Sequence, residues 1–365
     1  MSKSSLRVSK RLEAHVAYLP GEQPEETSSS SVIKLNTNEN PYPPSPAVQA
    51  SVGEEVALLN LYPNPKSSDL RKILAELHSL DPSQIILGNG SDDLLNLCVR
   101  CYSDDELKVA MMYPSYSLYD VLSGVQGSKM TRVPFLDDEF SLNLDAIASS
   151  EANLFFLTSP HAPSGRVYAL EDLRKVAQAV SGLLVIDEAY VDFAPESALP
   201  LVHEFEHILI TRTLSKSYSL AGMRVGYAMG HSKVIKQMDQ VREVYNLDRL
   251  AQVGAKAAIL DQEYFRSCLA KVIEQRNWLA NAFNELGWSF VSSGTNFIFV
   301  KPLSPDGCAS PEIAVSLFEH LAADKILVRY FSKHPQTNCF LRISIGKPVE
   351  MAMLMKSIKA WTQKA

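Results

Sequence analysis

The sequence predicts an α/β protein built on a largely parallel sheet with helices on both faces. Short apolar runs alternate with helix-like stretches between about residues 45 and 235, and the runs are continuously apolar. Strands of this kind are buried on both faces, as parallel strands usually are. After about residue 232 the pattern changes to long helical stretches with a few short strands, which predicts a smaller α+β domain.

The predicted elements follow one another in a regular order. Strands of the main sheet are expected at 84–87, 107–112, 153–158, 183–186 and 207–211, with a helix at 92–102. The Pro-rich stretch from Asn40 to Pro46 is expected to be an extended connector into a helix capped by Ser45, since a proline disfavours helix in the residue before it. The last part should hold helices over 232–285 and 348–362 and strands at 296–300, 326–329 and 340–344.

These elements divide the chain into an N-terminal arm (1–44), a large domain (45–240) and a small C-terminal domain (241–365). The first 31 residues are polar and end in four serines. Such a segment is expected to lie over the body of the protein, where it can still reach a binding site.

Composition and charge exclude several classes of protein. The chain has 365 residues and a net charge of −6, which argues against a nucleic-acid surface or an anionic-membrane face.

Its five cysteines are scattered along the sequence. The pair Cys98 and Cys101 lacks a second pair at zinc spacing, so packing in the core is favoured over a metal site. With no apolar leader and no run of 18 apolar residues, we expect a cytoplasmic protein.

Ligands of such sheets gather beyond the carboxyl ends of the strands, so the residues that follow each strand are the first candidates for a site. The strand at 84–87 is followed by a glycine-rich segment and then by Ser91 and Asp92 at the start of a helix. Free N–H groups at a helix start favour an anion, which makes this segment a candidate phosphate site. The alternative is that Ser91 or Asp92 is an ordinary helix N-cap.

Asp187 follows the buried strand at 183–186, and a buried carboxylate needs a partner. One reading is the magnesium-binding acid of a phosphate-loop NTPase, but the chain contains no G-x-x-x-x-G-K-[ST] motif. The other reading is an aspartate that pairs with the protonated ring nitrogen of a pyridine cofactor.

Lys216 follows the strand at 207–211. Burial and neighbouring cations lower the pKa of a lysine in such a place, which favours a Schiff base with a carbonyl cofactor. Arg224, between Gly222 and Gly226, could donate two parallel hydrogen bonds to a phosphate. Taken alone, Lys216 is more simply a solvated surface lysine.

Together these segments resemble the fold-type I pyridoxal-phosphate-dependent aminotransferases, and within them the histidinol-phosphate aminotransferases, over nearly the whole chain. The resemblance is carried by Thr211 to Lys216 with Gly222-x-Arg224-x-Gly226, by Asp187 to Tyr190, and by Asn38-Glu39-Asn40-Pro41. It implies pyridoxal 5'-phosphate as cofactor. It also implies transamination of L-histidinol phosphate with 2-oxoglutarate, giving imidazole acetol phosphate and glutamate in histidine biosynthesis.

The same resemblance implies a role for individual residues. Lys216 would form the Schiff base and move the substrate proton, Asp187 would pair with the ring nitrogen, and Tyr190 would hold the 3'-oxygen. The remaining cofactor residues would be Tyr116 stacked on the ring and, around the phosphate, Ser91, Asp92, Ser215 and Arg224. Tyr62 would reach the phosphate bound by a second copy of the chain, which implies a homodimer with a shared active site.

Three further residues match substrate positions of these relatives. Arg329 and Arg342 lie in predicted strands and match a pair used for the substrate phosphate and for the carboxylate of glutamate, while Tyr18 matches an arm tyrosine that closes over the phosphate. A buried arginine needs an anion, and the alternative for each arginine is an internal salt bridge.

The chain departs from the family pattern at Ala162, in Ser159 to Gly165. Ala162 stands where these relatives carry an asparagine that donates to the 3'-oxygen, and an alanine side chain cannot donate. The bound cofactor is therefore expected to hold its proton more tightly, which a pH titration of its colour against Ala162→Asn would test.

Other activities remain open at the level of sequence. Relatives on the same scaffold transaminate aromatic amino acids or decarboxylate threonine phosphate, and a cofactor-binding regulator without turnover is a further possibility. A different class is suggested by His203-Glu204-x-x-His207, which has the spacing of a zinc hydrolase. That motif requires one unbroken helix, whereas His207 starts a predicted strand, so no metal is expected.

Overall fold

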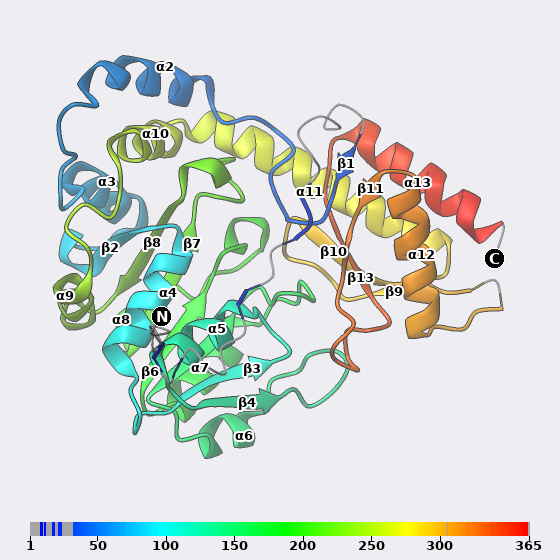
Figure 1. Cartoon of the computed structure of the whole chain (residues 1–365), viewed down its shortest axis with the longest axis horizontal. Helices are drawn as coiled ribbons and strands as arrows, with labels where there is room; N and C mark the ends of the chain where they lie inside the picture. The colour runs from blue at the N-terminus through cyan, green and yellow to red at the C-terminus, as the bar shows by residue number, and fades with distance from the viewer. Residues whose placement is uncertain are drawn as a thin grey trace, which may run out of the picture.

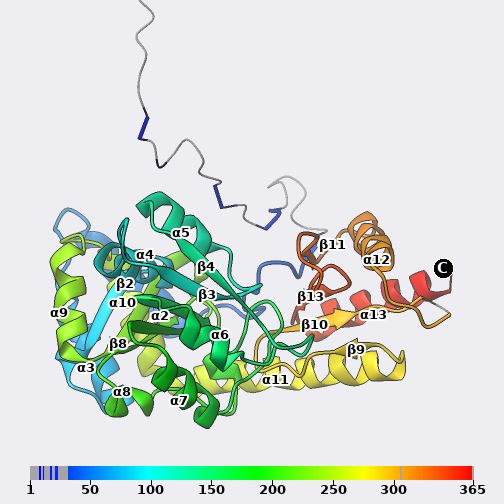
Figure 2. The ribbon, with the colours of Figure 1, turned by 90° about the horizontal axis from the view of Figure 1, so that it is seen from below.

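The chain forms two lobes joined by the long helix α11 (Gln262–Glu285), the yellow helix in Figures 1 and 2. A computed structural model describes residues 8, 9, 11, 17, 18, 21–23, 32–304 and 306–363. Most of the predicted arm, including the four serines, lies outside the described residues. Within the described part of the chain, no helix is long and apolar enough to span a membrane.

The larger lobe is built on a seven-stranded sheet in the order β2-β8-β7-β6-β5-β3-β4. The strands are β2 (Ile85–Asn89), β3 (Val109–Tyr113), β4 (Met130–Pro134), β5 (Leu154–Thr158), β6 (Leu183–Asp187), β7 (Ile208–Thr213) and β8 (Val225–Gly230). Only β8 runs antiparallel to its neighbours in this sheet, and the remaining pairs are parallel. The predicted α/β fold is confirmed.

Helices cover both faces of this sheet (Figure 1). They are α2 (Pro46–Glu55), α3 (Ser68–His78), α4 (Ser91–Tyr102), α5 (Leu118–Gln126), α6 (Leu144–Ser149), α7 (Leu170–Ala179), α8 (Leu201–Glu204), α9 (Ser232–Val241) and α10 (Arg249–Leu260). Successive strand residues enter different cores: Phe155 belongs to the core that includes residues of α7 and α10, whereas Phe156 belongs to the core that includes residues of α4 and α9. This burial on both faces explains why the strands read as continuous apolar runs.

The smaller lobe holds the antiparallel sheet β12-β13-β10-β9, with helices α11, α12 (Pro311–Ala323) and α13 (Pro348–Thr362). Its strands are β9 (Ser289–Phe290), β10 (Phe297–Lys301), β12 (Arg329–Tyr330) and β13 (Leu341–Ser344). A separate short pair joins β1 (Ile33–Lys34) to β11 (Ile326–Leu327) in parallel. The last part of the predicted arm is thereby tied to the smaller lobe.

Two strands of the main sheet were not predicted, and one predicted strand is divided. β8 contains Gly226 and Gly230, and β4 is an edge strand with partly exposed residues, so neither reads as a continuous apolar run. The predicted strand at 326–329 is split into β11 and β12, which belong to different sheets.

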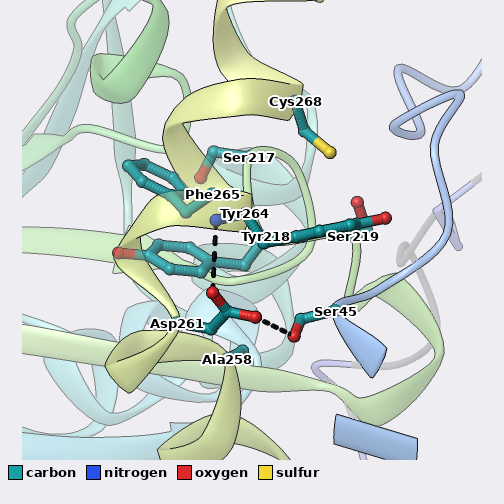
Figure 3. Close-up of a pocket in the computed structure, with 9 residues that line it drawn as sticks. All are labelled: Ser45, Ser217, Tyr218, Ser219, Ala258, Asp261, Tyr264, Phe265 and Cys268. Atoms are coloured by element: carbon teal, nitrogen blue, oxygen red, sulfur yellow. Dashed lines mark hydrogen bonds between the residues drawn. The ribbon is translucent and has the colours of Figure 1, made fainter. Parts of the chain in front are cut away.

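The junction between α10 and α11 lies at Asp261 (Figure 3). The carboxylate of Asp261 accepts hydrogen bonds from the backbone N–H of Tyr264 and from the hydroxyl of Ser45, which also caps α2 as predicted. The buried residues of α10 belong to the core of the large sheet. The domain boundary predicted at residue 240 stays a prediction, and from this packing we propose Asp261 as the point of division.

Candidate active site

The predicted site residues gather at the edge of the large sheet where β6 and β7 end. Asp187 is the last residue of β6 and pairs in register with Thr211 of β7, which runs parallel to it and leads into the loop that carries Lys216. The carboxyl ends of neighbouring parallel strands meet at one edge, so Asp187 and Lys216 reach the same side of the sheet.

Asp187 is a buried carboxylate, only 3% exposed. It accepts hydrogen bonds from the hydroxyl of Tyr119 at 2.7 Å and from that of Thr211 at 3.2 Å, and no basic side chain among the described residues forms an ion pair with it. Burial raises the pKa of Asp187 to about 6, against these hydrogen bonds. A carboxylate held this way favours a cationic N–H donor, as a protonated pyridine nitrogen would be.

Lys216 lies against the segment that precedes α2. Its Nζ donates to the carbonyl of Thr37 at 3.1 Å, and its own carbonyl accepts from the side chain of Asn40 at 2.9 Å. Burial and then the charge of Arg342 lower the pKa of Lys216 to about 8. A substantial fraction of this amine is therefore neutral near physiological pH, which both a nucleophile and a base require.

Tyr190 lies on the loop after β6, and its hydroxyl accepts a hydrogen bond from Nδ2 of Asn38 at 2.9 Å. Its ring centroid is 5.9 Å from Nζ of Lys216. Burial raises the pKa of Tyr190, while Arg342 and the hydrogen bond from Asn38 lower it. Ala162 is buried in the same apolar cluster and offers no donor.

The start of α4 forms the candidate phosphate cradle. Gly90 occupies the N-cap position with a φ of 81°, and no side chain caps the helix. The alternative that Ser91 or Asp92 is the N-cap is therefore wrong. Arg224 lies beside this helix start: its Nη1 donates to the hydroxyl of Ser215 at 3.2 Å, and its Nη2 pairs with the carboxylate of Asp92 at 3.1 Å.

Two glycines make this close approach possible. A Cβ on Gly90 would lie 2.4 Å from Nη2 of Arg224, and a Cβ on Gly226 would lie 2.3 Å from the backbone nitrogen of Ser91. The first N–H groups of a helix have no partner within the helix, and here a guanidinium and a hydroxyl lie beside them. These residues fit a phosphate group.

Tyr116 lies between the cradle and Asp187. Its hydroxyl donates to Asp92 at 3.2 Å, and its ring packs edge-on against Tyr119 at 5.5 Å between centroids. Tyr18 lies on the other side of it, at 6.1 Å. Together with Asp187, Lys216 and the phosphate cradle, this ring fits an aromatic cofactor that carries a phosphate.

The two predicted arginines lie opposite each other on neighbouring antiparallel strands, Arg329 on β12 and Arg342 on β13. Arg342 lies over the rings of Phe297 and Phe331, and its Nη2 donates to the carbonyl of Asn36 at 3.1 Å. Its Nε is buried without a partner, and no carboxylate of the described residues pairs with it. The predicted alternative of an internal salt bridge is therefore wrong for Arg342, and the pair of like charges favours an external anion.

Tyr62 is not part of this constellation. Its side chain is 77% exposed and stacks on Tyr245, with ring centroids 4.6 Å apart.

The two histidines of the zinc-hydrolase motif, His203 and His207, are separated in the structure. Helix α8 ends at Glu204, and Nε2 of His207 lies 3.0 Å from the carbonyl of Ala177. These two histidines do not share a helix face.

Several residues of the site were not assigned roles from the sequence. They are Asn36, Thr37, Asn38, Tyr119 and Thr211, which contact Arg342, Lys216, Tyr190 or Asp187. Tyr119 could have been found, because it lies three residues after Tyr116 in the segment that follows a predicted strand. The role of Asn38 depends on a contact between residues 152 positions apart, which no local pattern reveals.

The fold and the site define a cofactor-dependent group-transfer enzyme, and comparison with known proteins identifies its family. The family model described as aminotransferase class I and II matches residues 30–358, so the chain belongs to that family.

Within it, the histidinol-phosphate aminotransferase of Geotalea uraniireducens is 41% identical over 354 residues, covering 96% of this chain and 98% of that protein. The histidinol-phosphate aminotransferase of Geobacter sulfurreducens is 41% identical over 351 residues, covering 95% and 97%. The chain also resembles the crystal structure of histidinol-phosphate aminotransferase from Sinorhizobium meliloti in complex with pyridoxal-5'-phosphate. That structure is 26% identical, has a TM-score of 0.88 and covers 100% of both chains.

Proposed function

We propose that this chain is a pyridoxal-phosphate-dependent aminotransferase that converts L-histidinol phosphate and 2-oxoglutarate into imidazole acetol phosphate and glutamate. The observation that carries the proposal is the convergence of Lys216, Asp187 and Tyr190 with a phosphate cradle and with Arg342, whose Nε is buried without a partner. The relatives at 41% identity support the choice of substrate.

The residues of this chain divide the work of holding the cofactor. Asp187 and Tyr190 would bind the ring, Tyr116 would pack on it, and the phosphate would lie between the start of α4, Ser215 and Arg224. When bound, pyridoxal phosphate supplies a cationic ring that withdraws electrons from the substrate α-carbon. The negative charge of Asp187 would keep the ring nitrogen protonated.

Lys216 is the proposed base. Its amine, held at the carbonyl of Thr37 and with a pKa lowered to about 8, would take the proton from the substrate α-carbon and return it. Tyr190 and Thr37 contact this amine and restrict its position.

Arg329 and Arg342 are the proposed binding groups for the substrate phosphate and for the carboxylate of glutamate, with Tyr18 beside them. Their opposition across β12 and β13 supports this role, because an anion between two like charges relieves their repulsion.

Arg342→Gln is expected to raise the KM for 2-oxoglutarate by about 10- to 100-fold with a smaller effect on kcat, since a charge-assisted bond to the substrate is lost. Arg276→Gln is a matched control, because Arg276 is half-buried and donates to two backbone carbonyls. Steady-state kinetics for each substrate measures the effect. An unchanged KM for both substrates would exclude Arg342 from anion binding.

The proposed reaction is tested by the visible absorption spectrum of the purified holoenzyme. Histidinol phosphate should bleach the yellow band and 2-oxoglutarate should restore it, with glutamate formed in equal amount. A yellow protein that responds to phenylalanine instead would support the aromatic aminotransferase. Release of carbon dioxide from threonine phosphate would support the decarboxylase, and colour without any turnover would support a regulator.

We further propose that the protein is a homodimer in which Tyr62 reaches the cofactor phosphate of the second copy. Large apolar side chains are exposed beside Tyr62 and on the segment that stacks against it: Leu58, Leu59, Leu61, Val244 and Tyr245. The carbonyls of Leu61 and Tyr62 both accept from Arg249, so this surface is held in place. Exposed apolar surface of this kind favours association.

Tyr62→Phe is expected to weaken binding of pyridoxal phosphate to the apoprotein about tenfold, because one hydrogen bond to the phosphate is lost. Tyr245→Phe removes the hydroxyl of the stacked ring and should leave binding unchanged. Fluorescence titration measures the affinity and sedimentation measures the mass. A monomer that binds the cofactor equally well with either residue at position 62 would contradict the shared site.

We also infer that the protein works in the cytoplasm. The five cysteines are all unpaired, and three of them are partly or fully accessible, which suits a reducing compartment. Fractionation of the cells that produce the protein would test this, and recovery in a secreted fraction would contradict it.

A further inference from the structure

Asn38 joins the two lobes at the candidate site. It is 1% exposed and has a φ of 57°, a left-handed conformation that asparagine tolerates better than most residues. Its backbone N–H donates to the hydroxyl of Ser344 on β13, and its carbonyl accepts from Nδ2 of Asn296, both at 2.9 Å. The backbone of Asn38 is therefore anchored on the smaller lobe, while its side chain reaches Tyr190 in the larger one.

The direction of the side-chain hydrogen bonds follows from their partners. The Ser344 hydroxyl donates to Oδ1 of Asn38 at 2.9 Å, and among the described residues this is the only acceptor recorded for it. Nδ2 of Asn38 must then face Tyr190, at 2.9 Å. Because an amide nitrogen donates and does not accept, the oxygen of Tyr190 receives this bond and the phenolic hydrogen is not used in it.

We propose that Asn38 is a positioning residue that keeps the phenolic hydrogen of Tyr190 available to the bound cofactor, and that it compensates for the donor missing at Ala162. The inference rests on the proposed cofactor site. With only a methyl group at position 162, Tyr190 is the donor that remains for the 3'-oxygen. If Asn38 presented an acceptor instead, Tyr190 would donate to it and the 3'-oxygen would lose that bond.

The surroundings of Tyr190 agree with this role. The charged groups that act on it are Arg342, Asp187, Asp92 and, at 5.9 Å from its ring, Lys216. Arg342 draws negative charge onto the phenol oxygen, and the two carboxylates oppose it. The bond from Asn38 is the neutral one among these interactions, so a substitution there can remove the donor without removing a charge.

The test is a double-mutant cycle on the affinity of the apoprotein for pyridoxal phosphate, which does not depend on turnover. Asn38→Asp keeps the shape of the side chain but places an acceptor against Tyr190. It should raise the dissociation constant about tenfold in the native background. In the Tyr190→Phe background the same substitution should raise it by a clearly smaller factor, since the added negative charge acts in both backgrounds but no phenolic hydrogen remains to be redirected.

An equal loss of affinity in both backgrounds would overturn the proposal, because it would show that the substitution acts through packing or charge and not through the phenolic hydrogen of Tyr190. Asn153→Asp is a matched control: its carboxamide donates to the carbonyl of Tyr102 at the opposite end of β5, and affinity should not change. If Asn38→Asp does not fold, Ser344→Ala replaces it, since it removes the hydroxyl that orients the carboxamide.

The four proteins of the cycle are the native chain, Asn38→Asp, Tyr190→Phe and the double variant. They also separate this inference from the proposed function. An apoprotein that shows the predicted coupling but does not transaminate histidinol phosphate would leave the role of Asn38 intact and overturn only the substrate. Turnover of histidinol phosphate without any coupling between Asn38 and Tyr190 would overturn only the role of Asn38.

Discussion

Lys216→Ala is expected to lower kcat by about 10⁴-fold while the protein remains folded. The amine lies at the edge of the sheet where β6 and β7 end, and its lowered pKa, about 8, leaves a neutral fraction that can accept a proton. Alanine can neither hold the cofactor covalently nor move the proton of the substrate α-carbon. Single-turnover absorbance with each substrate measures the loss in both half-reactions.

The control for this prediction is Lys233→Ala. Lys233 is a surface lysine, 75% exposed, that pairs with Glu206 on the outside of the large lobe. Its substitution should leave both half-reactions unchanged. If Lys216→Ala retained activity within about tenfold of the native enzyme, another group would have to be the base.

Asp187→Asn is expected to lower kcat/KM on the order of 10³-fold and at the same time to stabilise the apoprotein at neutral pH. The loss of activity follows from removing the carboxylate that is proposed to pair with the cofactor ring. The gain in stability follows from the pKa of Asp187, which burial raises from 3.8 in the unfolded chain to about 6. Such a group favours folding below its unfolded pKa, and that contribution is lost as pH rises toward 6.

Two pKa units correspond to about 3 kcal/mol in the free energy of unfolding. The difference between the Asp187→Asn variant and the native apoprotein should therefore grow from pH 4 to pH 6 and then level off, as measured by urea unfolding. Asp239→Asn is a control for which the free energy of unfolding should change in the opposite direction. Asp239 pairs with Arg71 and Arg242, which hold its pKa below the usual range, so its substitution should destabilise the protein at neutral pH. A flat pH dependence for Asp187→Asn would contradict the prediction.

Much of the large lobe could be predicted from the sequence because its strands are buried on both faces. Continuous apolar runs located β2, β3, β5, β6 and β7, and the residues that follow them include Asp187 and Lys216. The strands that were missed do not carry this signal, since β8 contains two glycines and β4 lies at the edge of the sheet.

The position of the two arginines proposed to bind substrate is set by the register in which strands β12 and β13 pair. Arg329 and Arg342 are 13 positions apart in the sequence and were assigned only through family resemblance, yet β12 and β13 pair so that they lie directly opposite each other. Neither strand's own sequence reveals this opposition. This opposition supports the proposed anion site, because two like charges that face each other favour an anion between them.

The sequence by itself determined five of the seven strands of the large sheet and the polar residues at their ends, because burial imposes a local pattern of apolar residues that ends where the chain leaves the core. Only the tertiary structure decided which groups surround those residues. Asn38 reaches Tyr190, Thr37 accepts from Lys216 and Tyr119 donates to Asp187. Hydrogen bonds depend on distance and direction between atoms, and folding sets both across segments far apart in the sequence.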